Sequence, residues 1–156
     1  MALPSQLQPG LLPSEVEFLA TSTEHVHVVP LVRIDRVRLL SGVYGPLRPP
    51  TQARVPLWLA LNLKKRRKCH IVCPEWLHID NLRTLLRSEQ SNAAFASVPP
   101  FYQAIAKVLL ESAADDVPAA DDVREALKSL REARQSKVLA GLEMINADHL
   151  EVRSAA

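Results

Sequence analysis

The chain has 156 residues, enough for one ordinary domain or two small ones, and 47% of them are hydrophobic and 23% charged. These fractions are close to those of average globular proteins, so they exclude a wholly disordered chain. The formal net charge of +2, from 19 basic and 17 acidic residues, argues against a protein whose entire surface binds nucleic acid.

Phosphate-binding loops and common catalytic motifs are missing from the sequence. The chain has only four glycines and contains no GxGxxG, GxxxxGKS/T or GxSxG pattern. No Ser/His/Asp or Cys/His arrangement can be nominated as a nucleophile with its base. We therefore expect a protein that is not an enzyme, with no catalytic residue, no metal and no cofactor.

The sequence indicates a soluble, intracellular protein with no membrane association. Its two cysteines, Cys69 and Cys73, do not form a disulfide framework, which favours a reducing compartment. The N-terminus lacks a basic region and is interrupted by prolines, so it is a poor signal peptide. The longest apolar run, Val55 to Leu61, is too short to span a bilayer.

The first half of the chain predicts a short helix followed by strands. Ser14 and Glu17 form a capping-box pattern ahead of a helix over 15–20. β-Branched and alternating residues at 25–29, 31–34 and 36–39 then predict two or three short strands, followed by a turn signal at Ser41-Gly42. A proline-rich loop containing Gly45-Pro46 and Pro49-Pro50 follows.

The second half predicts helices. Helices are expected to begin at Pro56, near residues 99–100 and at Pro118, and Asp80 is expected to cap a further helix. The last helix should end near Ala140, with Gly141 as its C-terminal stop. The apolar residues at helical spacing are Leu57, Trp58 and Leu61, then Leu82, Leu85 and Leu86, then Phe101, Tyr102, Ile105, Val108 and Leu109, then Val123, Leu127 and Leu130. The acidic Asp121, Asp122 and Glu125 precede the basic Arg131, Arg134 and Lys137, an order that suits the helix dipole.

These elements predict an α+β fold that is mainly α. We expect a flexible tail over 1–13, a small β-rich domain over 14–54, and an α-helical bundle domain over 55–156. The order is thus a small N-terminal β-rich domain followed by the helical domain.

The most conspicuous local charge is the basic run Lys64, Lys65, Arg66, Arg67 and Lys68. Clustered cations suit phosphate contacts, because neutralised phosphates release counterions. On a helix, however, five successive residues spread around the circumference, so some meet the core side or acidic partners. Both alternatives stay open: a nucleic-acid contact, or a basic protein interface and solvated helix end.

Other polar clusters are read as structural. Cys69, His70, Cys73 and His78 offer zinc-type ligands, but their spacing matches no common finger and buried free thiols are common in cores. His25 and His27 alternate on one strand and are expected as an exposed pair on an edge strand. The pairs Asp115-Asp116 and Asp121-Asp122 are expected as capping charges before a helix.

Broad apolar helix faces are the main functional signal. A helical region of about a hundred residues has limited interior, so we expect a partner chain to cover part of these faces. A self-sufficient bundle is the alternative. The candidate core or subunit-interface anchors are Leu57, Trp58, Leu61, Trp76, Phe101, Tyr102, Ile105, Leu127 and Leu130.

Several short blocks of the sequence are distinctive: EVEFLA at 15–20, VPLWLALNLK at 55–64, KC at 68–69, PEWL at 74–77, PFY at 100–102, LL at 109–110, DVP at 116–118 and DVR at 122–124. Together these blocks resemble the GINS family, and within it the "Partner of SLD Five" subunits of type two. The resemblance extends from about residue 14 to about residue 142. PLWLA, followed by a basic run and PEW, is its most specific part.

The resemblance implies a non-catalytic structural subunit of a heterotetrameric complex. Family members have a helical A domain and a small β-rich B domain, and act in initiation and elongation of chromosomal DNA replication. The implied partners are the three other GINS subunits, the MCM helicase ring with its cell-division-cycle cofactor, and a replicative polymerase. The implied location is the nucleus, with DNA contact indirect or weak. The alternative is an independent nucleic-acid-binding module using residues 64–68.

Three departures from the family pattern stand out. The N-terminal tail to Pro13 is additional, and the basic run is more strongly charged than expected. The sequence stops at Ala156, where family members continue, so we expect the helical domain to lack a final helical segment.

Overall fold

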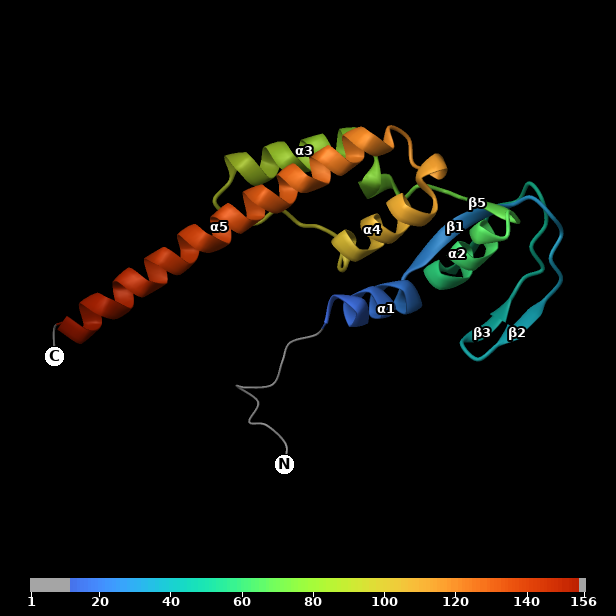
Figure 1. Cartoon of the computed structure of the whole chain (residues 1–156), viewed down its shortest axis with the longest axis horizontal. Helices are drawn as coiled ribbons and strands as arrows, with labels where there is room; N and C mark the ends of the chain where they lie inside the picture. Colours follow the sequence, from blue (N-terminus) through green and yellow to red (C-terminus); the bar gives the residue numbers. More distant parts are fainter. Residues whose placement is uncertain (1–11, 155–156) are drawn as a thin grey trace, which may run out of the picture. The chain divides into compact units, whose positions relative to one another are not determined.

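The computed structural model describes the backbone of residues 12–154 and the side chains of residues 12–143 (Figure 1). The fold is α+β and mainly α, as the sequence predicted. The chain forms two compact units: unit 1 contains residues up to 74 and 100–117, and unit 2 contains 75–99 and 118–156. The expected domain boundary between residues 54 and 55 lies inside unit 1, and the division into a β-rich and a helical domain stays a prediction.

Unit 1 contains a three-stranded antiparallel sheet in the order β4-β1-β5. Strand β1 (His25–Pro30) pairs with β4 (Ala53–Pro56) on one side and with β5 (Cys69–Ile71) on the other. Along β1 the burial alternates, so that Val26 and Val28 are buried while His25 and His27 are exposed. The two histidines thus share a solvent face, but the prediction of an edge strand was wrong, because β1 is the central strand.

A separate two-stranded hairpin follows β1. It consists of β2 (Val37–Leu39) and β3 (Gly42–Tyr44), joined by a turn at residues 40–41, after which Gly42 opens β3 with φ +143. Of the two or three strands predicted, β1 and β2 form, whereas in the stretch 31–34 Ile34 makes an isolated bridge to Leu47. Leu31 and Val32 are exposed, although the Leu31 N–H still donates a 2.8 Å hydrogen bond to the Lys68 carbonyl beside β5. Strands β4 and β5 were not predicted.

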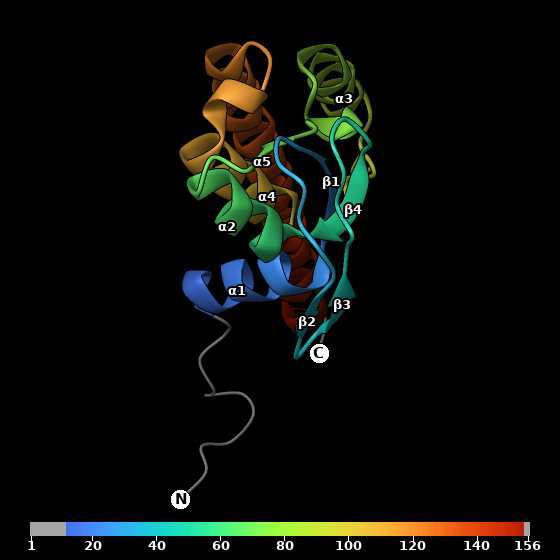
Figure 2. The same cartoon turned by 90° about the vertical axis from the view of Figure 1, so that its right-hand side faces the viewer.

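Three helices accompany the sheet of unit 1: α1 (Pro13–Thr23), α2 (Leu57–Lys65) and α4 (Tyr102–Ser112). Helix α2 lies beside the sheet in Figure 2, where α1 lies next to α2. A short 3-10 turn, η3 (Ala114–Asp116), follows α4. The core side chains come from every one of these layers and include Ala20, Val28, Val55, Leu57, Ala60, Cys69, Ile71, Ile105, Ala106 and Leu109.

Helix α1 begins earlier than the sequence predicted. Pro13 is its first residue, where the missing N–H costs nothing, and the Glu15 carboxylate accepts a 2.8 Å hydrogen bond from the Leu12 N–H. The cap predicted at Ser14 and Glu17 was therefore wrong, and Pro13 belongs to the helix and not to the expected tail. The rest of that tail, residues 1–11, lies outside the described residues.

Unit 2 is built on two helices that run side by side in the same direction (Figure 1). Helix α3 (Ile79–Ser91) follows the 3-10 turn η2 (Glu75–Leu77), and α5 (Ala120–Ser154) carries its buried Val123, Ala126 and Leu130 in the predicted stripe. Asp80 lies in the first turn of α3 and not at its cap, which is His78.

The predicted stop at Gly141 was wrong, because α5 continues through this position to Ser154. No atom lies within 4 Å of a Cβ built on Gly141, so neither a positive φ nor a close contact requires glycine there. A helix interior tolerates glycine at a cost of about 1 kcal/mol. Among the described residues, no helix combines the length and the apolarity needed to cross a bilayer.

Candidate interaction surfaces

The nine predicted anchors divide by burial. Leu57, Ile105 and Leu130 are buried and belong to the core. Phe101 is exposed at the start of α4, where its φ of 55 is unusual for a residue other than glycine. The remaining five are half-buried and are therefore available to a second chain without being fully exposed: Trp58, Leu61, Trp76, Tyr102 and Leu127.

Two of these half-buried anchors line a cavity in unit 1. Trp58 and Leu61, one turn apart on α2, form part of the wall of a hollow of about 510 Å³. Thr21 of α1, Asn62 and Lys65 of α2, and Ser112 at the end of α4 complete it. The lining of the cavity thus combines two apolar side chains with four polar ones.

Two large apolar side chains are exposed on α1. Phe18 is 70% exposed and Leu19 is also exposed, whereas Ala20 is fully buried. The helix is held in place by an ion pair of 2.9 Å between Glu17 Oε2 and Lys107 Nζ of α4. Phe18 is thus presented on a positioned helix, which is a typical arrangement for an interface anchor.

The second apolar surface lies on α5. The packing of α5 against α3 extends to Lys137, whose Nζ lies 2.9 Å from Glu89 Oε1. Just beyond it, Val138, Leu139 and Leu142 are 50%, 61% and 51% exposed. We refer to these three residues as the α5 apolar surface. Helix α5 then continues for a further twelve residues to Ser154.

A buried carboxylate supports this end of unit 2. Glu89 is fully buried, its Oε1 accepts from Lys137 Nζ, and its Oε2 accepts a 3.0 Å hydrogen bond from the Ala96 N–H. Burial alone raises the pKa of Glu89, but the bonds from Lys137 and Ala96 and the charge of Arg134 outweigh it, so the pKa lies below its usual range. The contact connects the 92–99 loop to α5.

The same loop carries an exposed aromatic ring. The Phe95 ring centroid lies 5.3 Å from Arg134 Cζ and 5.6 Å from Lys137 Nζ, so two cations of α5 hold its orientation. Phe95 remains exposed despite these contacts. The sequence analysis missed Glu89 and Phe95, since neither belongs to an apolar stripe.

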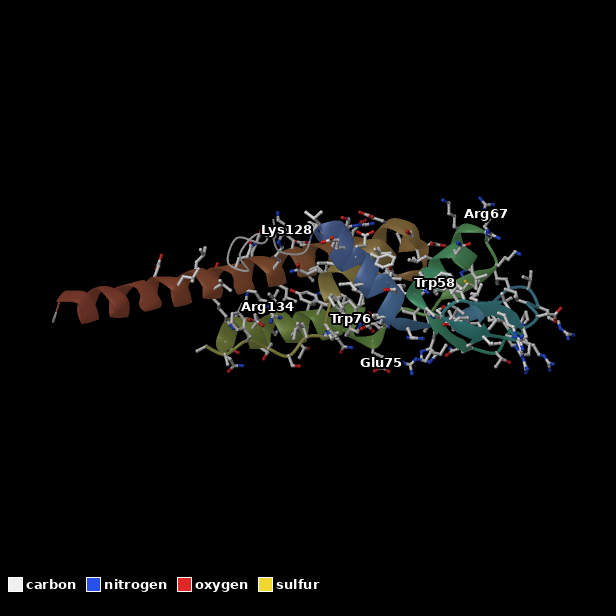
Figure 3. The ribbon with its side chains drawn as sticks, turned by 90° about the horizontal axis from the view of Figure 1, so that it is seen from below. Trp58, Arg67, Glu75, Trp76, Lys128 and Arg134 are labelled. Carbon is white, nitrogen blue, oxygen red and sulfur yellow. The ribbon has the colours of Figure 1, made fainter. Side chains whose placement is uncertain are left out.

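The basic run is not one continuous surface. The Lys64 side chain is only 11% exposed, and its Nζ lies 2.7 Å from Asp115 Oδ2 and 2.8 Å from Asp116 Oδ2. Burial lowers the pKa of Lys64, but the two carboxylates outweigh this and raise it. Lys65, Arg66, Arg67 and Lys68 are exposed, and Figure 3 shows Arg67 pointing away from the chain. Only these four residues could form a phosphate-contacting patch.

Asp116 connects three parts of unit 1. Besides Lys64, its Oδ1 lies 2.8 Å from His70 Nδ1 and its Oδ2 accepts a 2.7 Å hydrogen bond from the Ile71 N–H. Burial raises the pKa of Asp116, but these partners together lower it. Asp115 and Asp116 therefore join η3 to α2 and β5, and the prediction that they are helix caps was wrong. Asp121 and Asp122 do lie in the first turn of α5, as predicted.

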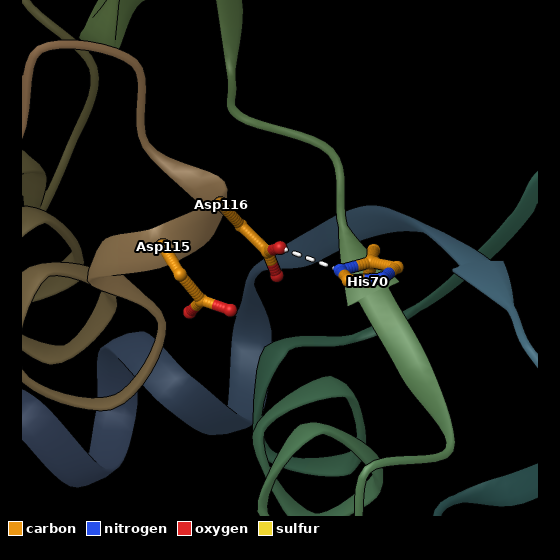
Figure 4. Close-up of side chains that lie close together, drawn as sticks. All are labelled: His70, Asp115 and Asp116. Carbon is orange, nitrogen blue, oxygen red and sulfur yellow. Dashed lines mark hydrogen bonds and ion pairs between the residues drawn. The ribbon is translucent and has the colours of Figure 1, made fainter.

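Three side chains lie close enough to share a cation. The ligand atoms of His70, Asp115 and Asp116 are within 4.8 Å of one another, and Figure 4 shows His70 bonded to Asp116. The ammonium group of Lys64 contacts both carboxylates and offsets one of their two negative charges, so a cation bound here would have to compete with Lys64 for the same oxygens.

The cysteine cluster does not resemble a zinc site either. Cys69 is buried, and its thiol donates a 3.7 Å hydrogen bond to the Ala60 carbonyl. Burial, together with the nearby negative charge of Asp116, raises the pKa of this thiol to about 11. Among the described residues, the ligand atoms of Cys69, Cys73 and His78 belong to no group of three or more that could share a metal ion. His70, the second member of that cluster, is held by Asp116.

Two family domains match the chain in succession. Residues 12–72 match the PSF2 N-terminal domain, and residues 76–154 match the GINS complex protein helical bundle domain. Together these matches cover both compact units.

Named relatives agree with these matches. The chain is 42% identical to "DNA replication complex GINS protein psf2" of Schizosaccharomyces pombe, over 94% of this chain and 79% of the relative. It is 43% identical to the corresponding protein of Xenopus laevis and 38% identical to that of Homo sapiens, in both cases over 80% of this chain and 68% of the relative.

Proposed function

Because the chain belongs to the PSF2 family of GINS complex proteins, with a role in DNA replication, we propose that it is a non-catalytic structural subunit of a heterotetramer. In this proposal three sister GINS subunits cover its apolar helix surfaces. The four-subunit complex then joins the MCM helicase ring and its cell-division-cycle cofactor in the nucleus. It serves both initiation and elongation of chromosomal replication, and contacts the replicative polymerase.

The α5 apolar surface is the observation that carries the subunit role. Val138, Leu139 and Leu142 are each at least half exposed on the helix segment that directly follows Lys137 and its contact with Glu89 of α3. Burying such side chains contributes about 1.5–3 kcal/mol each, so a soluble protein gains much by covering them. Phe18 on α1 and the cavity beside Trp58 are additional apolar surfaces for the same purpose.

Co-purification with tagged sister subunits tests the proposal. We expect the chain expressed alone to aggregate, and co-expression with the three sister subunits to yield a stable 1:1:1:1 complex. The variant Val138→Asp/Leu142→Asp should lose assembly, because it places charges on a surface that must be desolvated. A monodisperse, stable monomer that ignores the sister subunits would refute the subunit role.

A matched control is available on the same helix. Ser136 and Ala140 are exposed, have the same i, i+4 spacing as Val138 and Leu142, and lie on the opposite side of α5 at 100° per residue. The variant Ser136→Asp/Ala140→Asp adds the same charge and should assemble normally. Equal loss of assembly by both variants would indicate a general effect on the helix, and not an interface.

Replacement of the fission yeast relative tests the replication role. We expect the chain to support S phase in cells depleted of their own psf2 protein, and the assembly-defective variant not to do so. If wild-type chain assembles with the sister subunits yet the cells stop replicating, the proposed contacts with the helicase ring and its cofactor fail.

A second candidate function is nucleic-acid binding through the basic run. Lys65, Arg66, Arg67 and Lys68 are exposed at the end of α2 and in the following turn, which favours it. The absence of Lys64 from this exposed set limits the contact to about four phosphates, so DNA affinity should be weak and steeply salt-dependent. Salt-insensitive binding, or none, in an electrophoretic titration would eliminate this function.

A further inference from the structure

The positive charge of the chain is concentrated in one stretch of unit 1. Residues 25–73 contain ten of the 19 basic residues and, in Asp35, one of the 17 acidic residues. Half of that positive charge precedes the basic run. It consists of five arginines and no lysine: Arg33, Arg36, Arg38, Arg48 and Arg54. All five are exposed.

Four of these arginines belong to the β2–β3 hairpin and its two arms, residues 31–48, which we call the arginine hairpin. At its base, Ile34 and Leu47 exchange two backbone hydrogen bonds of 3.0 and 2.8 Å, and Arg33 and Arg48 adjoin this pair. Arg38 is opposite Val43 in the β2–β3 register, so their side chains share a face. Figure 3 shows nitrogen-tipped side chains gathered around these strands.

The hairpin leaves this charge largely uncompensated. Arg33 has a 3.6 Å contact with Asp35, both of them well exposed, and no ion pair within the described part of the chain involves Arg36, Arg38 or Arg48. Four guanidinium groups within residues 31–48 give this segment a positive potential. A negatively charged partner surface would be attracted to it.

Exposed aliphatic side chains alternate with the arginines. Leu31, Val32, Val37, Leu40 and Val43 are between 41% and 111% exposed. A surface rich in arginine and poor in lysine and acidic residues has the composition of protein–protein interfaces. A phosphate backbone would gain little from five aliphatic groups, which favours a protein over a nucleic acid as the partner.

We propose that the arginine hairpin docks onto an acidic, partly apolar surface of a protein that the four-subunit complex recruits. The proposal rests on the subunit role above. Obligate subunit interfaces are mostly apolar, as the α5 apolar surface is. A mixed charged and aliphatic surface is instead typical of a transient interface, from which the partner can dissociate. Arginine suits this task, since its guanidinium binds carboxylates with two parallel hydrogen bonds.

Charge reversal in the assembled complex tests the proposal. The purified four-subunit complex is titrated against purified MCM ring loaded with its cell-division-cycle cofactor, at two salt concentrations. Arg36→Glu/Arg38→Glu should weaken binding about tenfold or more and flatten its salt dependence. The control Arg66→Glu/Lys68→Glu makes the same charge change at exposed positions of unit 1 and should stay within about twofold of wild type. Equal losses in the two variants would overturn the proposal.

An uncharged variant separates a protein partner from nucleic acid. Leu40→Ser/Val43→Ser keeps every charge and should weaken binding to the same protein assembly about fivefold, because it removes the aliphatic contacts. Unchanged binding by this variant, together with loss of single-stranded or duplex DNA binding in Arg36→Glu/Arg38→Glu, would assign the hairpin to nucleic acid.

The failure of this inference differs from failure of the subunit role. All three variants should still co-purify with the sister subunits. If Arg36→Glu/Arg38→Glu prevents assembly of the tetramer, the hairpin contacts a sister subunit and the inference is wrong while the subunit role stands. If wild-type chain does not assemble, the subunit role itself fails.

Discussion

Lys137 of α5 donates a 2.9 Å hydrogen bond from Nζ to Oε1 of Glu89, a carboxylate with no exposed surface on α3. The two residues are 48 positions apart in the chain. Val138, the first residue of the α5 apolar surface, directly follows Lys137 in the chain. The contact therefore fixes α5 on α3 immediately before the surface on which the subunit role depends.

Removing Lys137 should loosen this end of unit 2. The variant Lys137→Met removes the hydrogen-bonded ammonium group from buried Glu89 and leaves it the charge of Arg134, at a cost of about 2–4 kcal/mol. Hydrogen exchange of the peptide containing the Ala96 amide, measured on the co-expressed complex, should accelerate by at least tenfold. The exposed neighbour Ser136→Met is the control, and unchanged exchange in Lys137→Met would show that the contact is not stabilising.

The Glu89 contact should also depend on pH. Because the folded-state pKa lies below the usual value of 4.5, the contribution of Glu89 is complete above that value and is lost as the pH falls through the lower folded-state pKa. The thermal midpoint of the wild-type complex should exceed that of Glu89→Gln at pH 7, and the difference should shrink in acid. A constant difference from pH 7 to pH 3 would contradict the assignment.

Lys64 and Lys65 are neighbours with opposite surroundings and provide a matched test. Lys64→Met removes the cation shared by Asp115 and Asp116 and should destabilise unit 1 by about 1–2 kcal/mol. Lys65→Met changes an exposed side chain and should shift stability by less than about 0.5 kcal/mol. Exchange of the Ile71 amide, which donates to Asp116, reports the difference directly.

Arg67 should be replaceable by glycine with a gain in stability. Its φ of 55 ends α2 in the left-handed region, where its N–H donates to the Lys64 carbonyl at 2.8 Å. Arg67→Gly relieves this strain and should raise stability by about 0.5–1 kcal/mol. The control is Arg66→Gly. Arg66 has a φ of −87, so its replacement by glycine relieves no backbone strain and should not raise stability. A lower thermal midpoint for Arg67→Gly would contradict the prediction.

The two cysteines should react with iodoacetamide in a fixed order. Cys69 is buried and its pKa is about 11, so about one thiol in a thousand is ionised at pH 8. Burial also raises the pKa of Cys73, but this side chain is only half-buried. Mass spectrometry of the native protein should find Cys73 alkylated first and Cys69 only after unfolding, and simultaneous labelling would refute the buried position of Cys69.

Helices were easier to predict than strands in this chain. The apolar residues of α3 and α4 recur every three or four positions over three turns, a spacing that is typical of an amphipathic helix and differs from the alternation of a strand. Strands β4 and β5 have four and three residues, too few for an alternating pattern to be recognised. They exist because β1 lies between them and supplies their hydrogen bonds, which is a non-local condition.

The candidate surfaces were only partly visible in the sequence. Periodicity identified Leu57, Phe101 and Leu130 equally as anchors, although the folded chain buries two of them and exposes the third. The arginine hairpin has a lysine-free composition that is visible in the sequence. Its arginines are spread over residues 33–48, however, and form no continuous run like the one at residues 64–68.

Local patterns alone specified the helical character of the second half, the inward face of β1 and, through specific blocks such as PLWLA, the family. Those properties depend on residues that are near neighbours in the chain, so the spacing and types of those residues are enough to predict them. Only the folded chain decided which equivalent residues are free to bind a partner. Lys64 is engaged and Lys65 is not, because Asp115, 51 residues further along, approaches one side of α2.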